Sequence, residues 1–212
     1  MNIKNKHILD NIVWSDLDDT KETFDKIYKR NLWYSKESIS GKGSEKKSVE
    51  NILNVLPEIF SELNIKTIVD APCGDYCWFK DLNYDFENYT GIDIVDDLIK
   101  ENNFKYSNDT TNFICLDIIN AKIPKADLIL CRDCFIHLSF DNILKAIDNF
   151  RKSSSIYLLT TTYKDVVCNN DIYDGGFRKI DLTLPPFNFK EPMIEILEND
   201  NKYLSLWRID TL

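Results

Sequence analysis

The stretch Lys66–Phe79 constrains the fold more than any other part of the chain. A short apolar run, Thr67–Val69, ends in the carboxylate of Asp70, and a proline and a glycine interrupt the chain directly afterwards. A run this short, apolar and β-branched suits a strand that is buried on both faces of a parallel sheet. Asp75 then offers the side chain of a helix N-cap. The stretch therefore predicts a strand, a tight turn and the start of a helix.

The rest of the chain alternates strand-like and helix-like segments. Apolar runs predict further strands at Asn88–Val95, Thr111–Asp117, Ala126–Asp133 and Ser155–Thr162. Helical spacing of apolar residues predicts helices at about 96–103 and 140–151 between them. Such alternation indicates right-handed strand–helix–strand units and a parallel sheet. The last two runs, Pro192–Glu198 and Tyr203–Ile209, flank a short polar turn and predict an antiparallel hairpin.

The sequence predicts two units, an N-terminal extension and a main domain that contains this alternation of strands and helices. Residues 1–44 form an expected N-terminal helical extension that ends in a Ser/Gly loop, Ser38–Ser44, with two glycines and three serines. We call this loop the lid loop; its composition suits a flexible linker or a backbone nest for an anionic group. Residues 45–212 form the main domain, which begins with an amphipathic helix. Pro57 should kink that helix or mark a boundary within it.

Composition excludes several classes of protein. The formal net charge of −9 argues against a bulk electrostatic grip on nucleic acid or on an anionic membrane. No apolar run approaches the roughly eighteen residues of a membrane span, and the first residues lack the apolar core of a secretory signal. We therefore expect a cytoplasmic protein without nucleic-acid or membrane partners, and its oligomeric state stays open.

The six cysteines most often fall in apolar runs, where cysteine behaves as a small hydrophobic residue. Cys131 and Cys134 have the spacing of a redox or metal motif. A zinc site needs a second pair, and the only candidate, Cys73 with Cys77, has a different spacing. The expectation is thiols without a metal.

Three carboxylates follow the first three predicted strands of the main domain: Asp70, Asp93 and Asp117. In a doubly wound sheet the carboxyl ends of these strands line one crevice. Asp93 lies 19 residues after Gly74, a spacing that suits a carboxylate on both ribose hydroxyls. Asp117 can accept from the amine of adenine. A dinucleotide or S-adenosylmethionine (SAM) fits these groups, but a turn with one glycine suits a pyrophosphate poorly.

The chain resembles class I SAM-dependent methyltransferases in four motifs. These are Val69-Asp-Ala-Pro-Cys-Gly-Asp75, Gly91-Ile-Asp-Ile-Val95, Cys115-Leu-Asp117 and Asp127-Leu-Ile-Leu-Cys-Arg-Asp133. The resemblance covers residues 45–212 and implies a doubly wound α/β fold of seven strands in the order 3-2-1-4-5-7-6, the last strand antiparallel. It is nearest to a bacterial branch with a Ser/Gly loop and a late Gly-Gly-x-Arg segment, whose members often accompany surface-polysaccharide genes.

The resemblance also implies how SAM is held. Asp70 and Gly74 lie against its methionine part, Asp93 on the ribose, and Asp117 with Ile118 at the adenine. The same motifs and their neighbours add five cofactor-binding candidates: Ala71, Cys73, Trp78, Ile94 and Arg132. Pro72 departs from the family's usual glycine and removes one backbone donor from the turn.

The candidates for acid–base chemistry are few, because the chain has only two histidines, His7 and His137. His7 belongs to a terminus that we expect to be mobile. His137 follows the fourth predicted strand of the main domain, so we expect it either to act as a general base or to pack beneath the site. Asp133 is expected to orient His137, with a base or a metal ligand as alternatives.

The acceptor candidates come from two regions. Arg178, in the polar loop 169–178, can hold an anionic or hydroxyl-rich acceptor, or form a surface salt bridge. Aromatic faces near the lid loop suit a sulfonium or a sugar. The full set of acceptor-binding candidates is Trp33, Tyr34, Ser44, Tyr163, Asn170 and Arg178.

These observations predict a SAM-dependent methyltransferase, most simply an O-methyltransferase acting on a sugar, sugar nucleotide or glycan precursor. A nitrogen or phosphate-type oxygen of another metabolite is an alternative acceptor. A non-catalytic SAM-binding module and a nicotinamide-dependent enzyme are the rival functions. RNA methylation is disfavoured by the acidic charge.

Overall fold

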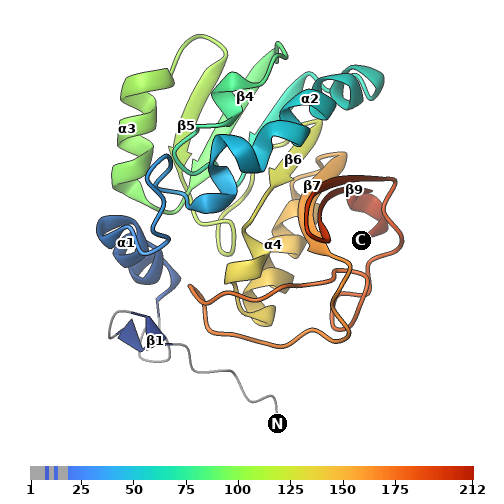
Figure 1. The fold of residues 1–212 in the computed structure, drawn as a ribbon. Helices are drawn as coiled ribbons and strands as arrows, with labels where there is room; N and C mark the ends of the chain where they lie inside the picture. Colours follow the sequence, from blue (N-terminus) through green and yellow to red (C-terminus); the bar gives the residue numbers. More distant parts are fainter. Residues whose placement is uncertain (1–7, 10–11, 14–18) are drawn as a thin grey trace.

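A computed structural model describes residues 8–9, 12–13 and 19–212 of the protein. A seven-stranded sheet forms its centre (Figure 1). The strands are β3 (Thr67–Asp70), β4 (Asn88–Asp93), β5 (Thr111–Cys115), β6 (Leu128–Cys131), β7 (Tyr157–Tyr163), β8 (Ile194–Asn199) and β9 (Lys202–Arg208). Their spatial order is β5-β4-β3-β6-β7-β9-β8. The strands β3 to β7 pair in parallel, whereas β9 runs antiparallel to both β7 and β8. The predicted order and the predicted hairpin are confirmed.

Helices cover both faces of this sheet. The α-helices are α1 (Thr20–Arg30), α2 (Lys46–Glu62), α3 (Asp96–Tyr106) and α4 (Phe140–Lys152). Single 3₁₀ turns occur at Lys42–Ser44, Phe79–Asp81, Phe135–His137 and Ile209–Thr211. The apolar side of α2, with Ile52 and Leu56, belongs to one buried cluster, and that of α4, with Ile143 and Ile147, belongs to another. Successive residues of a strand point to opposite faces of a sheet. Ile68 belongs to one cluster and Val69 to the other, so the two clusters lie on opposite faces.

The N-terminal extension contains α1, as helical spacing predicts, and one feature that the sequence does not show. A two-stranded antiparallel pair, β1 (Ile8–Leu9) with β2 (Ile12–Val13), precedes the helix. Helix α1 begins after Asp19, whose side chain accepts from the backbone N–H of Glu22 as an N-cap. His7 lies outside the described residues.

The helix predicted at Asp75 is absent, and this expectation was wrong. Between β3 and β4 the described backbone contains only the 3₁₀ turn Phe79–Asp81. Gly74 and Tyr76 adopt positive φ angles of 53° and 57°, which a right-handed helix does not allow. Aromatic side chains fill the space instead: Tyr76 packs near Tyr89 and Phe113, with ring centroids 4.9 Å and 5.1 Å apart. An aromatic cluster thus replaces a helix on this face.

Two further connections differ from a regular alternation of strand and helix. The segments 116–127 and 164–193 contain no α-helix, and Figure 1 shows the second as a long orange coil beneath α4. Pro57, in contrast, interrupts nothing, because α2 continues through it from Lys46 to Glu62 as a single helix. Within the described part of the chain, no helix is both long enough and apolar enough to cross a membrane.

Candidate active site

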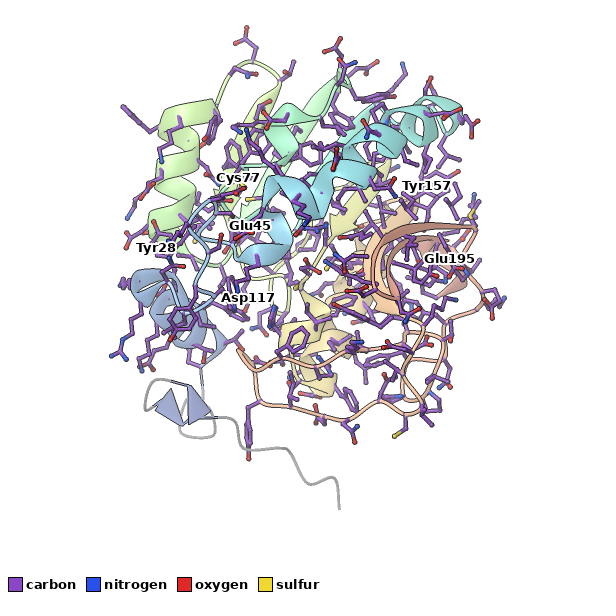
Figure 2. All side chains as sticks on the ribbon, in the orientation of Figure 1. Tyr28, Glu45, Cys77, Asp117, Tyr157 and Glu195 are labelled. Atoms are coloured by element: carbon purple, nitrogen blue, oxygen red, sulfur yellow. The ribbon has the colours of Figure 1, made fainter. Side chains whose placement is uncertain are left out.

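One crevice opens at the carboxyl ends of the parallel strands. Its walls come from α1, the lid loop and the turns that follow β3, β4, β5 and β6, and it contains about 1,030 Å³ of empty space when the open solvent at its mouth is included. Figure 2 labels Asp117 toward α1, whereas Tyr157 of β7 and Glu195 of β8 lie on the opposite side of the view. The predicted residues that line the crevice are Trp33, Ser44, Asp70, Cys73, Gly74, Trp78, Asp93, Ile94, Asp117, Ile118, Arg132, Asp133 and His137.

Asp93 ends β4 and closes the turn that follows β3. Its Oδ2 accepts from the backbone N–H of Gly74 at 3.2 Å, and its Oδ1 accepts from that of Val95 at 3.0 Å. Burial raises the pKa of Asp93 to about 6, although these backbone donors oppose the shift. The two N–H bonds fix the carboxylate in the crevice, where it retains the capacity to accept hydroxyl donors.

Asp70 is the second buried carboxylate of the crevice. Only 2% of the residue is exposed, and the hydroxyl of Tyr89 donates to its Oδ2 at 2.7 Å. Burial raises its pKa to about 7, against the influence of Tyr89 and Arg132. No described cation lies within ion-pair distance of Asp70, so a positively charged ligand group here would relieve the cost of burying it.

The far end of the crevice combines apolar walls with one polar residue. Asp117 follows β5 and accepts from the backbone N–H of Ile119 at 2.8 Å and from Nδ2 of Asn120 at 2.6 Å. Apolar side chains surround it, including Leu98 and Leu116. Helix α1 closes this end, and its Tyr28 donates to Glu101 of α3 at 2.9 Å. The arrangement suits a flat, mostly apolar ring with a polar edge.

Asp75, expected to cap a helix, holds the lid loop instead. Its carboxylate accepts from Ser38 Oγ at 2.9 Å, from the backbone N–H of Ile39 at 3.0 Å and from Ser40 Oγ at 3.2 Å. Ser40 Oγ in turn accepts from the backbone N–H of Asp75 at 2.9 Å. These bonds place the lid loop over the turn that follows β3, where an added Cβ on Gly74 would lie 2.2 Å from Ser40 Oγ.

A buried group of four charges adjoins the crevice. Arg132 donates to Glu198 through Nε at 3.2 Å and through Nη2 at 2.6 Å, and its guanidinium lies over the Trp78 ring at 5.4 Å. Lys202 pairs with Glu198 at 3.0 Å and with Asp133 at 2.7 Å. The side chains of Arg132, Lys202 and Glu198 are 4%, 6% and 0% exposed, so two cations and two anions are neutralised within the protein.

Arg132 also reaches the lid loop, since its Nη2 donates to the backbone carbonyl of Gly43 at 2.7 Å. The expected cofactor-binding residue thus lines the crevice while its guanidinium is bonded to protein groups. Glu198, its main partner, comes from β8 and was not among the predicted site residues.

His137 lines the same crevice from the 3₁₀ turn after β6. Its Nδ1 lies 2.7 Å from the carbonyl oxygen of Gly176, and its ring lies 5.2 Å from that of Trp33. A carbonyl only accepts, so Nδ1 must carry the proton and Nε2 of the neutral ring keeps its lone pair. Burial lowers the pKa of His137, which keeps the ring neutral at pH 7.

Asp133 does not orient His137 as expected. The residue has a positive φ of 52° and directs its carboxylate to Lys202, while its backbone N–H donates to Thr161 Oγ1 at 2.9 Å. Arg132 and Lys202 lower the pKa of Asp133 to about 2 despite burial. The group that orients the imidazole is the carbonyl of Gly176.

Five predicted site residues do not line the crevice. Ala71 is buried beneath it, Tyr163 belongs to a core cluster, and Tyr34 is 55% exposed. Asn170 is exposed, and its carbonyl accepts from Nε of Arg178 at 3.1 Å. The guanidinium of Arg178 bonds to backbone carbonyls, so the structure gives this residue partners other than an acceptor.

Several residues of the crevice were missed. They come mostly from α1, the lid loop and the strand ends: Thr20, Phe24, Ile27, Tyr28, Ile39, Ser40, Pro72, Ile92, Val95, Leu98, Leu116, Ile119, Cys134 and Leu138. Helical spacing identified the inner face of α1, but no sequence signal shows where that face docks. All six cysteines are free thiols, and the described residues contain no group of three or more potential metal ligands.

Comparison with known proteins adds the identity of the fold. No protein-family model matches the sequence, and no curated protein matches it significantly. Among solved structures, magnesium protoporphyrin IX methyltransferase from Synechocystis PCC 6803, with bound SAM, has a TM-score of 0.60 and 11% identity over 91% of this chain and 98% of that chain. This chain has a methyltransferase fold.

Two other solved structures show the same likeness. The 1,6-didemethyltoxoflavin-N1-methyltransferase from Burkholderia thailandensis, with bound 1,6-didemethyltoxoflavin and S-adenosylhomocysteine, has a TM-score of 0.59 and 11% identity over 89% of this chain and 86% of that chain. The N-methyltransferase NodS from Bradyrhizobium japonicum WM9 has a TM-score of 0.54 and 15% identity over 78% and 98%. Identities this low establish a shared fold, and the activity has to be argued from the crevice.

Proposed function

We propose that the protein is a SAM-dependent methyltransferase that acts on a hydroxyl of a small polar acceptor, such as a sugar, sugar nucleotide or glycan precursor. The observation that carries the proposal is that one crevice is lined by two buried carboxylates, Asp70 and Asp93, and by the imidazole of His137. The methyltransferases of the same fold, crystallised with SAM or S-adenosylhomocysteine, support it.

The residues present suit SAM. Asp70 is a buried carboxylate without an ion-pair partner among the described residues, which is what an ammonium group requires. Asp93 can accept from the two hydroxyls of a ribose. The apolar walls around Ile118, with Asp117 at their edge, suit adenine. When bound, SAM supplies a methyl group that is activated by a positively charged sulfur.

The protein itself has two tasks in this proposal. It aligns the acceptor with the methyl group, and correct alignment alone accounts for a large part of the acceleration in such transfers. It also removes the acceptor's proton: Nε2 of His137 retains a lone pair because Nδ1 is occupied by Gly176. A hydroxyl needs this assistance more than a neutral amine, because a neutral hydroxyl oxygen is a much weaker nucleophile than a neutral amine nitrogen. Trp33, beside His137, offers an aromatic face to the apolar side of a sugar ring.

The first experiment is calorimetric titration of the protein with SAM and S-adenosylhomocysteine. Both should bind, and Asp93→Ala should abolish binding. Asp96→Ala is the matched control, because Asp96 lies three residues further on with its side chain 50% exposed. Failure of the wild-type protein to bind either compound would refute the proposal.

A second experiment tests the base. His137→Ala should keep its affinity for S-adenosylhomocysteine and lower turnover by roughly a hundredfold on an acceptor found by screening sugars and their nucleotides. Unchanged turnover would make His137 a packing residue. Transfer to amines in preference to alcohols would replace the proposed acceptor class, and binding without any transfer would indicate a non-catalytic module.

A further inference from the structure

Four consecutive backbone carbonyls surround the turn that carries His137, and one short segment donates to all of them. The backbone N–H of Gly175 donates to His137 O at 2.8 Å, and that of Arg178 donates to Ile136 O at 3.1 Å. The guanidinium of Arg178 donates through Nη1 to Phe135 O at 2.6 Å and through Nη2 to Leu138 O at 2.8 Å. Residues 175–178 therefore enclose the turn Phe135–His137.

Arg178 is a buried cation whose guanidinium bonds to backbone carbonyls. The residue is 9% exposed, its guanidinium lies over the Phe140 ring at 5.4 Å, and among the described residues it forms no ion pair. Burial lowers its pKa to about 10, although Asp171 and Asp174 oppose the shift. A buried cation bonded to three carbonyls uses the planar fork of a guanidinium, which a lysine cannot reproduce.

The two glycines before it bring the segment close to His137. Gly175 adopts a φ of 86°, a conformation that favours glycine. A Cβ on Gly176 would lie 3.1 Å from the carbonyl oxygen of Tyr173, so a side chain there would press on the backbone. Gly176 is the residue whose carbonyl binds Nδ1 of His137.

Two carboxylates just before this segment, Asp171 and Asp174, bind α4 and α1. Asp174 accepts from the backbone N–H of Ser139 at 2.7 Å, from Asn142 Nδ2 at 2.6 Å and from Thr20 Oγ1 at 2.6 Å. Asp171 accepts from the backbone N–H of Phe140 at 2.8 Å. Both carboxylates therefore cap the start of α4, whose own Ser139 forms no side-chain cap.

We propose that Arg178 is a positioning residue, which holds the turn Phe135–His137 and the Gly176 carbonyl together so that His137 presents Nε2 to the crevice. The proposal rests on the proposed function, in which His137 is the base. It differs from the expectation that Arg178 binds the acceptor, because three nitrogens of its guanidinium donate to backbone carbonyls.

The test is the tautomer of His137, measured by long-range ¹H–¹⁵N NMR at pH 8, with His137→Gln assigning the signal between the two histidines. Wild type should carry its proton on Nδ1. Arg178→Met should give a mixture of tautomers or the proton on Nε2. Asp133, Arg178 and Lys202 are the charges that act on this ring. In Arg178→Met the pKa of His137 should therefore rise toward its usual value, as water reaches the ring and a positive charge is lost.

Kinetics separate positioning from acceptor binding. Arg178→Met should lower kcat by roughly tenfold to a hundredfold, with the acceptor KM within about twofold of wild type. Arg178→Lys should show the same changes to a smaller degree, because one ammonium cannot span Phe135 O and Leu138 O together. Arg208→Met, at an exposed arginine paired with Asp210, should change nothing.

Gly176→Ala covers the case in which Arg178→Met does not fold, since it displaces the Nδ1 acceptor and leaves Arg178 in place. The proposal would be overturned if both Arg178→Lys and Gly176→Ala kept the wild-type tautomer and the wild-type kcat. It would also be overturned if Arg178→Met raised the acceptor KM and left kcat unchanged. Wild-type turnover in His137→Ala would instead remove the base role. The NMR result would still show whether Arg178 sets the tautomer.

Discussion

Gly43 lies directly against the carboxylate of Asp133: a Cβ at position 43 would come within 2.4 Å of Oδ2. The first residue belongs to the lid loop and the second follows β6, so they are 90 residues apart in the chain. Arg132 reinforces the contact through its bond to the Gly43 carbonyl. At position 43, therefore, the space between the lid loop and Asp133 admits no side chain.

Gly43→Ala should therefore lift the lid loop from the crevice. Asp133 cannot retreat easily, because Lys202 and Thr161 hold its carboxylate and its backbone. Overpacking of this kind costs about 1–3 kcal/mol, and each 1.4 kcal/mol that falls on the bound state weakens affinity about tenfold. Calorimetry with S-adenosylhomocysteine checks this. Lys42→Ala, at an exposed neighbour in the same loop, is the control, and an equal loss in both variants would contradict the prediction.

The two carboxylates predict how ligand binding depends on pH. Burial raises the pKa of Asp70 to about 7 and that of Asp93 to about 6, so both are largely protonated in the free protein at pH 5.5. An ammonium and ribose hydroxyls favour the ionised form. The affinity for S-adenosylhomocysteine should thus rise from pH 5.5 to 7.5. Asp70→Asn should flatten the upper part of this rise, and a flat wild-type profile would refute the assignment.

The same groups act in the opposite direction on the free protein. The folded pKa of each lies above the unfolded value of 3.8, so the folded state binds protons more tightly. Their contribution to stability is therefore present at low pH and is lost as the pH rises from about 4 through 7. Thermal denaturation with and without S-adenosylhomocysteine measures this effect. The increase in melting temperature that the ligand causes should become larger as the pH rises over this same range.

The sequence predicted most of the sheet, because its strands are buried runs with few alternatives. Ile68 and Val69, like Leu128–Cys131, form short apolar runs that favour strands buried on both faces of a sheet, and Asp70 ends the first run at the edge where the crevice opens. The hairpin at the end was equally clear from its polar turn. These features depend on short stretches of chain, so local pattern suffices.

What could not be predicted depends on contacts between distant segments. Asp75 has the sequence context of a helix cap, but its partners are Ser38–Ser40, more than thirty residues earlier. Arg178 looks like a ligand-binding arginine until the turn at Phe135–His137 is seen to occupy it. Glu198 gives no sequence signal, because its role is set by the pairing of β8 with β9 beside Arg132.

The buried charges predict a large cost for a conservative change. Glu198→Gln removes the anion that holds both Arg132 and Lys202, and leaves two buried cations with Asp133 alone. Breaking a buried pair in this way costs about 3–5 kcal/mol of unfolding free energy. Urea denaturation measures it. Glu195→Gln, whose partner Lys164 is about as exposed as itself, should cost less than about 1 kcal/mol. Equal costs would show that the cluster does not stabilise the hairpin.

The last prediction concerns the fastening of the lid loop by Asp75. Asp75→Ala removes the acceptor for Ser38, Ile39 and Ser40, and hydrogen bonds to a charged group contribute about 1.5–3 kcal/mol each when they are buried. Because this carboxylate is only partly buried, we expect a smaller effect, concentrated in the loop.

Hydrogen exchange of the Ile39 amide should accelerate, since that N–H donates to Asp75 Oδ2 at 3.0 Å. The affinity for S-adenosylhomocysteine should fall about tenfold, which corresponds to about 1.4 kcal/mol, while the urea midpoint changes little because the sheet is untouched. Asp81→Ala, which removes an exposed carboxylate paired with Lys80, is the matched control. If Ile39 exchanges at the wild-type rate in Asp75→Ala, the loop is held by Gly43 and Arg132 alone, and its closure does not depend on the turn after β3.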